Sequence, residues 1–176
     1  MLFKELETDR LNLKKVKIDD TNILWDKFFC NYEEYKFYKF EKIKDYKEYE
    51  QIVINQINNY EKGNYYRWNI FIKETNELIG SINLHHYDVN DNNIKIGYFI
   101  FKEYRNKGYA TECVLKVIDF AFDTLKVHRI TAGTIEGNEF SNKTLLKAGF
   151  TFEGTKKEDH KIDGKYYDSN IFGLLK

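Results

Sequence analysis

Apolar residues recur along this 176-residue chain at two spacings, which separate predicted strands from predicted helices. Near the start, apolar and polar residues alternate over 11–18, which predicts a strand. Apolar residues that recur three and four positions apart then predict two helices. The first follows the candidate N-caps Asp19, Asp20 and Thr21 and contains Ile23, Leu24 and Phe28. Asp45 is placed to cap the second, whose apolar face consists of Tyr46, Tyr49, Val53, Ile57 and Tyr60.

The middle of the chain predicts strands. Residues 67–73 and 77–84 are rich in β-branched and aromatic side chains, and the polar turn 74–76 between them is typical of a hairpin. A polar loop then leads to another apolar segment at 94–101. Gly97 inside this segment marks either a bulge or a close approach of another group to the backbone.

Helices and strands alternate in the second half. The strongest helical pattern follows Gly108 and consists of Ala110, Cys113, Val114, Val117, Ile118, Ala121, Phe122 and Leu125. A strand is expected at 128–134, and Asn138 can cap a short helix after it. Two strands at about 150–160 and 166–175 complete a mixed α/β sheet with helices on both faces.

Composition and charge narrow the class of protein. The chain has 42% hydrophobic and 32% charged residues, which predicts one globular domain, 1–176. It carries 28 Lys and Arg against 28 Asp and Glu, so it lacks the basic excess of a general nucleic-acid binder. Charges begin at Lys4 and no stretch reaches the roughly 18 apolar residues of a membrane span, so neither a secretory signal nor a membrane partner is expected.

The cysteines and histidines predict neither a disulfide nor a metal site. Cys30 and Cys113 are far apart in sequence and form no CxxC pair, so we expect free thiols, core or half-buried, in a cytoplasmic protein. The four histidines, at 85, 86, 128 and 160, have no partners at metal-ligand spacing, and no structural metal is expected.

One loop is a candidate ligand site. The segment EYRNKGYATE (103–112) brings Arg105, Lys107 and Gly108 to the start of the strongest predicted helix. The first turn of a helix has N–H groups without intrahelical partners and a partial positive charge, and glycine permits close approach of a ligand. The loop is either a phosphate site or an ordinary polar loop. It matches neither GxxxxGK[ST] nor GxGxxG.

Five segments, in order, resemble the GNAT (Gcn5-related N-acetyltransferase) superfamily, in particular its RimJ/RimL-type members. The sequence RNKGYA at 105–110 resembles the R/Q-x-x-G-x-G/A motif, and IGYFIFKEYRNKGYATE resembles the subgroup's strand, loop and helix start. TDRLNLKK resembles T-x-R-L-x-L-R. NEFS at 138–141 with Gly149-Phe150 resembles N-x-x-S…GF, and DGKYYD at 163–168 resembles a closing G-x-y-x-D hairpin. The resemblance spans nearly the whole chain.

The resemblance implies a GNAT fold and acetyl-CoA as cofactor. The fold would be a mostly antiparallel sheet of about seven strands, splayed at the family's strands 4 and 5 and flanked by about four helices. Backbone N–H groups of 105–110 would bind the CoA pyrophosphate, and the strand near Gly97 would pair with the pantetheine arm and polarise the thioester carbonyl. The implied acetyl-CoA or CoA residues are Tyr98, Phe99, Ile100, Phe101, Arg105, Asn106, Lys107, Gly108, Tyr109, Ala110, Thr111, Asn138, Ser141, Asn142 and Lys143.

The chain departs from the family pattern at the proton-transfer groups. Many relatives place a tyrosine acid where this chain has Leu145, so Ser141 is the nearest substitute, as in RimL-like members; its other role would be a polar residue of a first helical turn. Glu158 and His160 are candidate bases because alternate strand residues share a face, although RimL-like members have glutamate at the second position. Both are otherwise solvated side chains.

Other titratable residues have simpler interpretations. Asp168 is either an acceptor-site carboxylate or a hairpin-stabilising one, and we favour the structural role; Glu112 is interpreted as an acid that suits the start of a helix. His85 and His86 end a predicted strand and are further candidates for the acceptor cleft.

The leading hypothesis is an acetyl-CoA-dependent N-acetyltransferase in which an amine attacks directly in a ternary complex. The acceptor is left open between a protein N-terminal α-amine and a small amine such as a polyamine or antibiotic, and a homodimer also stays open. An alternative is a non-catalytic CoA-binding sensor or regulatory module, favoured by the missing tyrosine at 145 and glutamate at 160. A nucleotide-binding protein unrelated to CoA is a third hypothesis.

Overall fold

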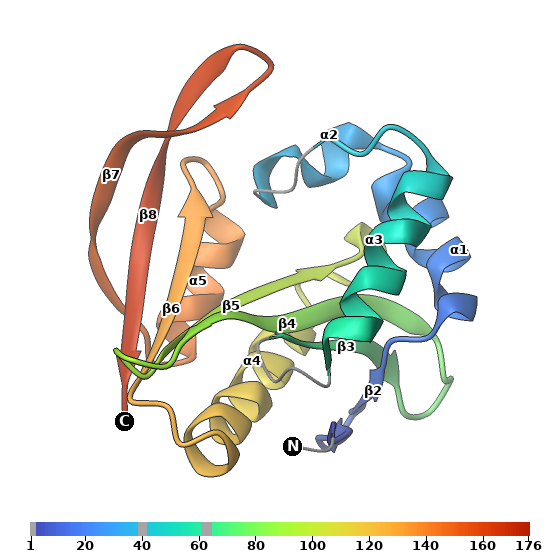
Figure 1. Ribbon diagram of the computed structural model, residues 1–176, viewed down its shortest axis with the longest axis horizontal. Coiled ribbons are helices and arrows are strands. Elements are labelled where there is room, and N and C mark those ends of the chain that lie inside the picture. Colours follow the sequence, from blue (N-terminus) through green and yellow to red (C-terminus); the bar gives the residue numbers. More distant parts are fainter. Residues whose placement is uncertain (1–2, 39–41, 61–64) are drawn as a thin grey trace.

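An eight-stranded sheet with helices on both faces forms the protein (Figure 1). The computed structural model describes residues 3–38, 42–60 and 65–176. The strands lie in the order β1-β2-β3-β4-β5-β6-β8-β7, and β5–β6 is the parallel pair in an otherwise antiparallel sheet. The predicted mixed, mostly antiparallel sheet is confirmed, with eight strands where about seven were expected.

The first half of the chain contributes five strands and three α-helices. These are β1 (Leu6–Glu7), β2 (Leu11–Lys15), α1 (Thr21–Leu24), α2 (Tyr32–Tyr35), α3 (Tyr46–Asn59), β3 (Tyr65–Ile72), β4 (Leu78–Asp88) and β5 (Asn93–Ile100). The predicted first helix continues from α1 as a π-helical turn, Trp25–Phe29. Asp45 caps α3 as predicted, since its Oδ1 accepts from Glu48 N at 3.0 Å. β1 and α2 were not predicted, because such short segments show no period.

The second half contributes α4 (Tyr109–Asp119), β6 (Arg129–Ile135), α5 (Glu139–Lys147), β7 (Thr151–Ile162) and β8 (Lys165–Leu175). Asn138 caps α5 as predicted: its Oδ1 accepts from Ser141 N at 3.2 Å. The long β7–β8 hairpin turns at Asp163 and Gly164, both with positive φ. Figure 1 shows this hairpin extending on the same side as α2.

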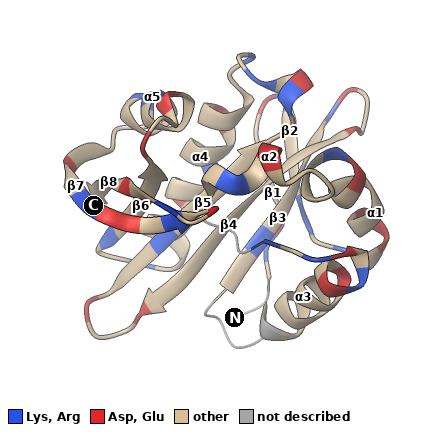
Figure 2. Cartoon of the chain, turned by 90° about the horizontal axis from the view of Figure 1, so that it is seen from above, with Lys and Arg blue, Asp and Glu red and all other residues tan. Residues whose placement is uncertain are grey.

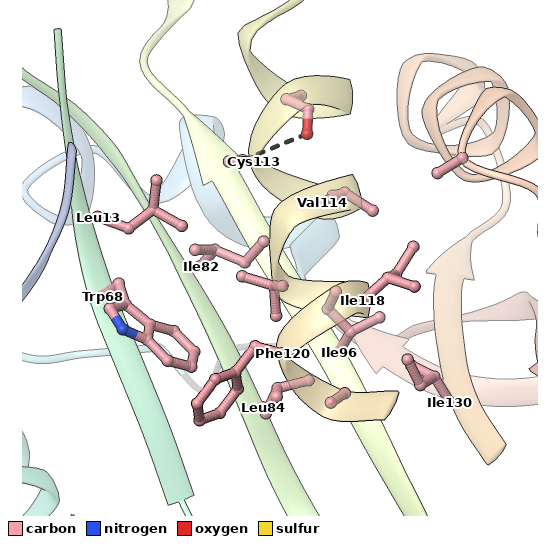
Figure 3. Close-up of a cluster of buried hydrophobic side chains, with 14 of the residues drawn as sticks. Leu13, Trp68, Ile82, Leu84, Ile96, Cys113, Val114, Ile118, Phe120 and Ile130 are labelled. Carbon is pink, nitrogen blue, oxygen red and sulfur yellow. Dashed lines mark hydrogen bonds between the residues drawn. The ribbon is translucent and has the colours of Figure 1, made fainter. Parts of the chain in front are cut away.

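Two apolar cores lie on opposite faces of the sheet. On one face α4 packs its predicted apolar side, including Cys113 and Val114, over Trp68 and Ile82 (Figure 3). On the other face α1, the π-helical turn and α3 cover an aromatic core, in which Phe28 stacks on Phe99 of β5 at a centroid distance of 4.1 Å. Full burial of one large apolar side chain stabilises the fold by roughly 1.5–3 kcal/mol. Because β5 contributes side chains to both cores, packing on each face of the sheet fixes its position.

β5 and β6 separate after three residue pairs. Residues 93–95 pair with 129–131, and beyond Lys95 β5 pairs with β4 alone. Figure 1 shows the two strands diverging from there. The splay implied by the family resemblance is confirmed, and it lies between the fifth and sixth strands because the short β1 adds one to the count.

Charges are mixed over the surface, in keeping with the balanced composition. Figure 2 shows basic and acidic residues interspersed along the helices, loops and outer strands. No helix within the described residues is long and apolar enough to cross a membrane. The same residues contain no group of three or more His, Cys, Asp or Glu side chains that could hold a metal ion.

The stacked pair Phe28–Phe99 predicts that Phe28→Ala lowers the free energy of unfolding by about 3–5 kcal/mol, because the buried ring leaves a cavity. Phe152→Ala is the matched control, since Phe152 is 50% exposed, and it should change stability by less than about 1 kcal/mol. Chemical denaturation of both variants measures the difference. Equal losses would contradict the assignment of Phe28 to the core that supports β5.

Candidate functional site

The loop before α4 forms a small cradle at the start of that helix. Gly108 has a left-handed backbone with φ of 81°, and Asn106 also has positive φ. A Cβ at Gly108 would be strained by this φ and would lie 3.3 Å from a guanidinium nitrogen of Arg10, so glycine suits the position. The loop thereby turns into α4 with the first N–H groups of the helix facing outward.

A hollow of about 170 Å³ lies against this cradle. It is lined by Ile100, Tyr104, Arg105, Asn106, Gly108, Tyr109, Ala110, Thr111, Phe140, Lys143, Thr144 and Lys147. Within the described chain, the backbone N–H groups of 106–111 donate to no backbone carbonyl. They therefore remain available as donors to a ligand. Together with the ammonium groups of Lys143 and Lys147, they fit a phosphate or diphosphate group.

Sequence patterns missed four of these lining residues: Tyr104, Phe140, Thr144 and Lys147. Three lie on α5, where Phe140, Lys143, Thr144 and Lys147 share one face at three- and four-residue spacing. Since Lys143 is a predicted site residue, helical spacing from it is the signal that could have identified Phe140, Thr144 and Lys147.

The guanidinium of Arg105 is used inside the protein. Its Nε donates to Ile100 O at 2.9 Å, and its terminal nitrogen pairs with Glu34 at 3.3 Å. Arg105 therefore fixes the loop against the end of β5, and α2 neutralises its charge.

An N-terminal clamp holds the loop from the other side. Arg10 pairs with Glu112 at 2.6 Å and also donates to Lys107 O at 3.1 Å, while Thr8 Oγ1 donates to Glu112 at 2.5 Å. Burial opposes the charge of Glu112, but the hydrogen bonds from Thr8 and Arg10 outweigh it and lower its pKa. Glu112 thus does more than complement the helix dipole: it joins the TDRL segment to α4.

The separation from β6 leaves one edge of β5 open. Phe101 N donates to Ile79 O at 2.8 Å, so in this antiparallel ladder the odd residues of β5 bond to β4 and the even ones face the other way. Tyr98 and Ile100 therefore present backbone groups toward the gap, whereas Phe99 and Phe101 bond to β4 and bury their rings. Of the four predicted strand residues, Tyr98 and Ile100 are placed to pair with a ligand, Ile100 through its N–H, because Ile100 O already accepts from Arg105 Nε.

A larger cleft of about 870 Å³ lies beside the open edge. It is lined by Tyr38, Gln56, Tyr65, Asn83, His85, His86, Tyr87, Lys95, Ile96, Gly97, Tyr98, Thr131, Gly133, Lys156, Asp159 and Ile171. Ile100 lines the phosphate-sized hollow and Tyr98 lines this cleft, so the open edge runs from one to the other. An extended ligand can follow it between them.

Gly97 marks a close approach, and the bulge alternative is wrong. The pairing of β4 with β5 is regular where Asn83 lies opposite Gly97. The irregularity in this pairing lies between His85 and Asp88. A Cβ at Gly97 would lie 3.2 Å from Asn83 Oδ1 and 3.5 Å from His85 Cε1. The amide and the imidazole thus lie against the backbone of β5 at the cleft.

His85 is a half-buried, uncharged imidazole at neutral pH. Burial is the main cause of its lowered pKa, and the positive fields of His86 and Lys95 add to it, giving a pKa of about 4. Its Nδ1 lies 2.6 Å from Asn83 Oδ1. His85 and His86, which the sequence offers as candidates for an acceptor cleft, both line this cleft.

Ser141 lies on the other side of the open edge, in the first turn of α5. Tyr98 OH is 3.0 Å from Ser141 Oγ and also donates to Ser141 O at 3.3 Å. Burial raises the pKa of Tyr98, so the phenol stays protonated. Asn142 accepts from Thr134 Oγ1 at 2.6 Å, and Leu145 is buried.

The predicted bases Glu158 and His160 lie on β7 outside the residues that line the cleft. β7 has a bulge between Lys156 and His160, and Glu158 has φ of 50°, so the regular alternation behind that prediction is interrupted. Lys156 and Asp159 are the β7 residues that reach the cleft. Asp168 pairs with Lys157 at 2.7 Å and accepts from Glu158 N, which supports its structural role.

The two thiols differ. Cys113 lies on the buried face of α4, and burial raises its pKa. Cys30 is exposed at the end of the π-helical turn, so the expectation that both thiols are core or half-buried is wrong for Cys30.

Comparisons with known proteins agree with this arrangement. The family model described as an acetyltransferase (GNAT) domain matches residues 10–151. The N-acetyltransferase YoaA of Bacillus subtilis is 32% identical over 175 residues, 99% of this chain and 98% of the relative. The N-acetyltransferase p20 of Bacillus licheniformis is also 32% identical, over 97% and 96%. The solved structure of RimL, a ribosomal L7/L12 α-N-protein acetyltransferase in complex with coenzyme A, matches with a TM-score of 0.88 and 16% identity over 98% of each chain.

The cradle predicts that Gly108→Glu raises the Kd for coenzyme A at least about tenfold, because the side chain adds bulk and a negative charge where a diphosphate would bind. Gly164→Glu is the matched control: Gly164 also has positive φ, but it lies in the β7–β8 turn. Calorimetry measures both affinities. Unchanged affinity in Gly108→Glu, or an equal loss in the control, would contradict the assignment.

Proposed function

The chain belongs to the GNAT family of acetyltransferases, and we propose that it acetylates the α-amine of a peptide N-terminus. Its relatives over nearly the whole chain are N-acetyltransferases, which gives no support to the alternative of a CoA-binding module without turnover. The acceptor class is our inference from the cleft and from the cost of using different amines.

The donor side of the proposal uses the cradle and the open edge of β5. Acetyl-CoA, when bound, supplies a thioester carbonyl that an amine can attack. The N–H groups of 106–111, with Lys143 and Lys147, would hold its diphosphate. Tyr98 and Ile100 would pair with the pantetheine amides, and Tyr98 N–H is placed to polarise the carbonyl near the cleft.

The charge of the cleft is the observation that carries the acceptor assignment. Among its described lining residues, Asp159 is the one carboxylate, and Lys95 and Lys156 face it with positive charge. A polyamine carries several positive charges and would need several carboxylates to replace its hydration. A peptide N-terminus brings one amine, and its backbone and side chains can contact Tyr38, Tyr65 and Tyr87.

The protonation cost of the amine points the same way. An α-amine with pKa near 8 is roughly 10% neutral at pH 7, which costs about 1.4 kcal/mol. A lysine side chain with pKa near 10.4 costs about 4–5 kcal/mol. The described residues that line the cleft include no carboxylate cluster that could bind a polycation strongly enough to offset this difference. RimL, which shares the fold, is described as an α-N-protein acetyltransferase.

Ser141 and Tyr98 would protonate the leaving thiolate. The two hydroxyls form a hydrogen-bonded pair at 3.0 Å on the donor side of β5, so a proton given by Ser141 can be replaced from Tyr98. Because a thiolate with pKa near 8.5 leaves readily, the acid contributes modestly.

Ser141→Ala is expected to lower kcat by about tenfold while the affinity for coenzyme A stays the same. Tyr98→Phe should reduce kcat to a similar extent, since it removes the second hydroxyl of the pair. Steady-state kinetics and calorimetry separate the two effects. If kcat is unaltered in both variants, Ser141 is a helix-start residue and Tyr98 a structural one.

The acceptor class can be tested by acetyl-CoA turnover with a free-thiol readout. Peptides with a free N-terminus should release thiol, whereas the same lysine-containing peptides with an acetylated N-terminus should react at least about tenfold more slowly. Spermidine and an aminoglycoside complete the panel. Faster turnover of either small amine than of every free peptide would overturn the peptide assignment and leave the family assignment intact.

A further inference from the structure

The pair Asn83–His85 on β4 has no role in the chemistry described above. Both side chains project from the face of the sheet that α1 and α3 cover, because their β5 partners Gly97 and Lys95 share the parity of buried Phe99. Both line the cleft. Residue 97 is a glycine, and the Asn83 and His85 side chains pack against the position that a Cβ would occupy there. The residue next in sequence, Tyr98, carries the N–H on the open edge.

The contact between the two side chains orients the imidazole. Asn83 Oδ1 lies 2.6 Å from His85 Nδ1, and a carbonyl oxygen can only accept, so this contact favours the tautomer with the hydrogen on Nδ1. The neutral ring then has an unprotonated Nε2. In catalytic histidines, a hydrogen bond from one ring nitrogen commonly fixes the tautomer. The second ring nitrogen is then left unprotonated and can accept a proton.

The two faces of the sheet separate the two proton transfers. Tyr98 and Ser141 lie on the face covered by α4 and α5, where the thiol side of the donor would be. His85 lies on the opposite face, at the cleft from which the amine would enter. An amine that attacks a carbonyl held at Tyr98 N–H would have its own N–H hydrogens directed into the cleft.

We propose that His85 is the general base of the acetyl transfer and that Asn83 is the residue that positions it. The assignment rests on the proposed transfer to an amine in this cleft. As the new C–N bond forms, the nitrogen becomes acidic and gives one proton to His85 Nε2. The C–S bond then breaks, its electron pair leaves with sulfur, and the thiolate takes a proton from the Ser141–Tyr98 pair. His85 returns its proton to solvent, and the Ser141–Tyr98 pair takes one back from solvent.

The surroundings keep His85 in its accepting form. Lys95 holds positive charge near it, and Lys156 and Asp159 of β7 line the same cleft. Its lowered pKa, about 4, means that the ring of the resting protein is neutral above about pH 5 and is free to accept a proton from the attacking amine. The rise of kcat/KM between pH 6 and 8 should therefore follow the acceptor amine, with no inflection from His85.

The kinetic test uses whichever amine of the panel the wild-type protein acetylates best, so it runs even if the peptide assignment fails. His85→Gln should lower kcat at least about 100-fold with unchanged Kd for coenzyme A. Asn83→Ala should lower kcat about tenfold, and added imidazole should restore part of the activity of His85→Ala. His128→Gln is the control, because His128 is exposed and lies outside the cleft.

His160→Gln compares the rival base directly. A kcat of His85→Gln within twofold of wild type, or a loss confined to His160→Gln, would overturn the proposal. Nitrogen-15 NMR of the imidazoles gives a measurement independent of turnover. It should show His85 protonated at Nδ1 and bare at Nε2 from pH 5 to 8, and Asn83→Ala should remove this preference. A hydrogen on Nε2 of wild-type His85 would also overturn the proposal.

Discussion

The departure of β6 from β5 beyond Lys95 is the constraint on which the rest of the structure depends. A strand inside a sheet normally satisfies both of its edges, and unpaired backbone groups are costly when they are buried. Here Tyr98 and Ile100 keep backbone groups without a partner strand. The gap is maintained from α5, which follows β6 and receives the phenol of Tyr98 at Ser141. Thr134 of β6 is tied to the same helix through Asn142. The gap is therefore a built feature of the sheet.

β5 also divides the molecule into two chemical sides. Its odd residues face the aromatic core and its even residues face α4 and α5, and the cleft is lined by residues of both sets, Ile96, Gly97 and Tyr98. Backbone N–H groups and lysines that suit an anion gather on the second side, at the start of α4 and along α5. The uncharged imidazole of His85 and the aromatic lining of the cleft gather on the first. Because one strand carries both sets, a ligand paired with its edge meets both without any rearrangement of the sheet.

Sequence patterns anticipated the parts that are local. The caps Asp45 and Asn138, the hairpin 74–76 and the apolar face of α4 all follow from spacing within one element. The cradle at Gly108 could be predicted for the same reason, since a strand, a glycine and a helix start are neighbours in the chain. Two-residue β1 and four-residue α2 could not, because they are too short to show a period.

What the sequence missed depends on contacts between distant segments or on irregular strands. The bulge in β7 breaks the alternation that put Glu158 and His160 on one face, and nothing in the residues 156–160 marks it. The pairing of Asn83 with Gly97 is a matter of register between two strands. The hydrogen bond of Tyr98 to Ser141 joins residues 43 positions apart. Such contacts follow from the folded topology, and local periodicity does not record them.

The clamp of Thr8 and Arg10 on Glu112 has a consequence for how the protein assembles. These contacts span 104 and 102 positions of the chain, among the longest closures in the fold. Closing loops of this length costs conformational entropy, which slows the formation of such contacts. The loop at Gly108 therefore acquires its final shape only when the N-terminal strand has docked on α4. On a ribosome, where the N-terminus emerges first and waits for the rest, the anion-binding loop would mature only after more than half of the chain had been made.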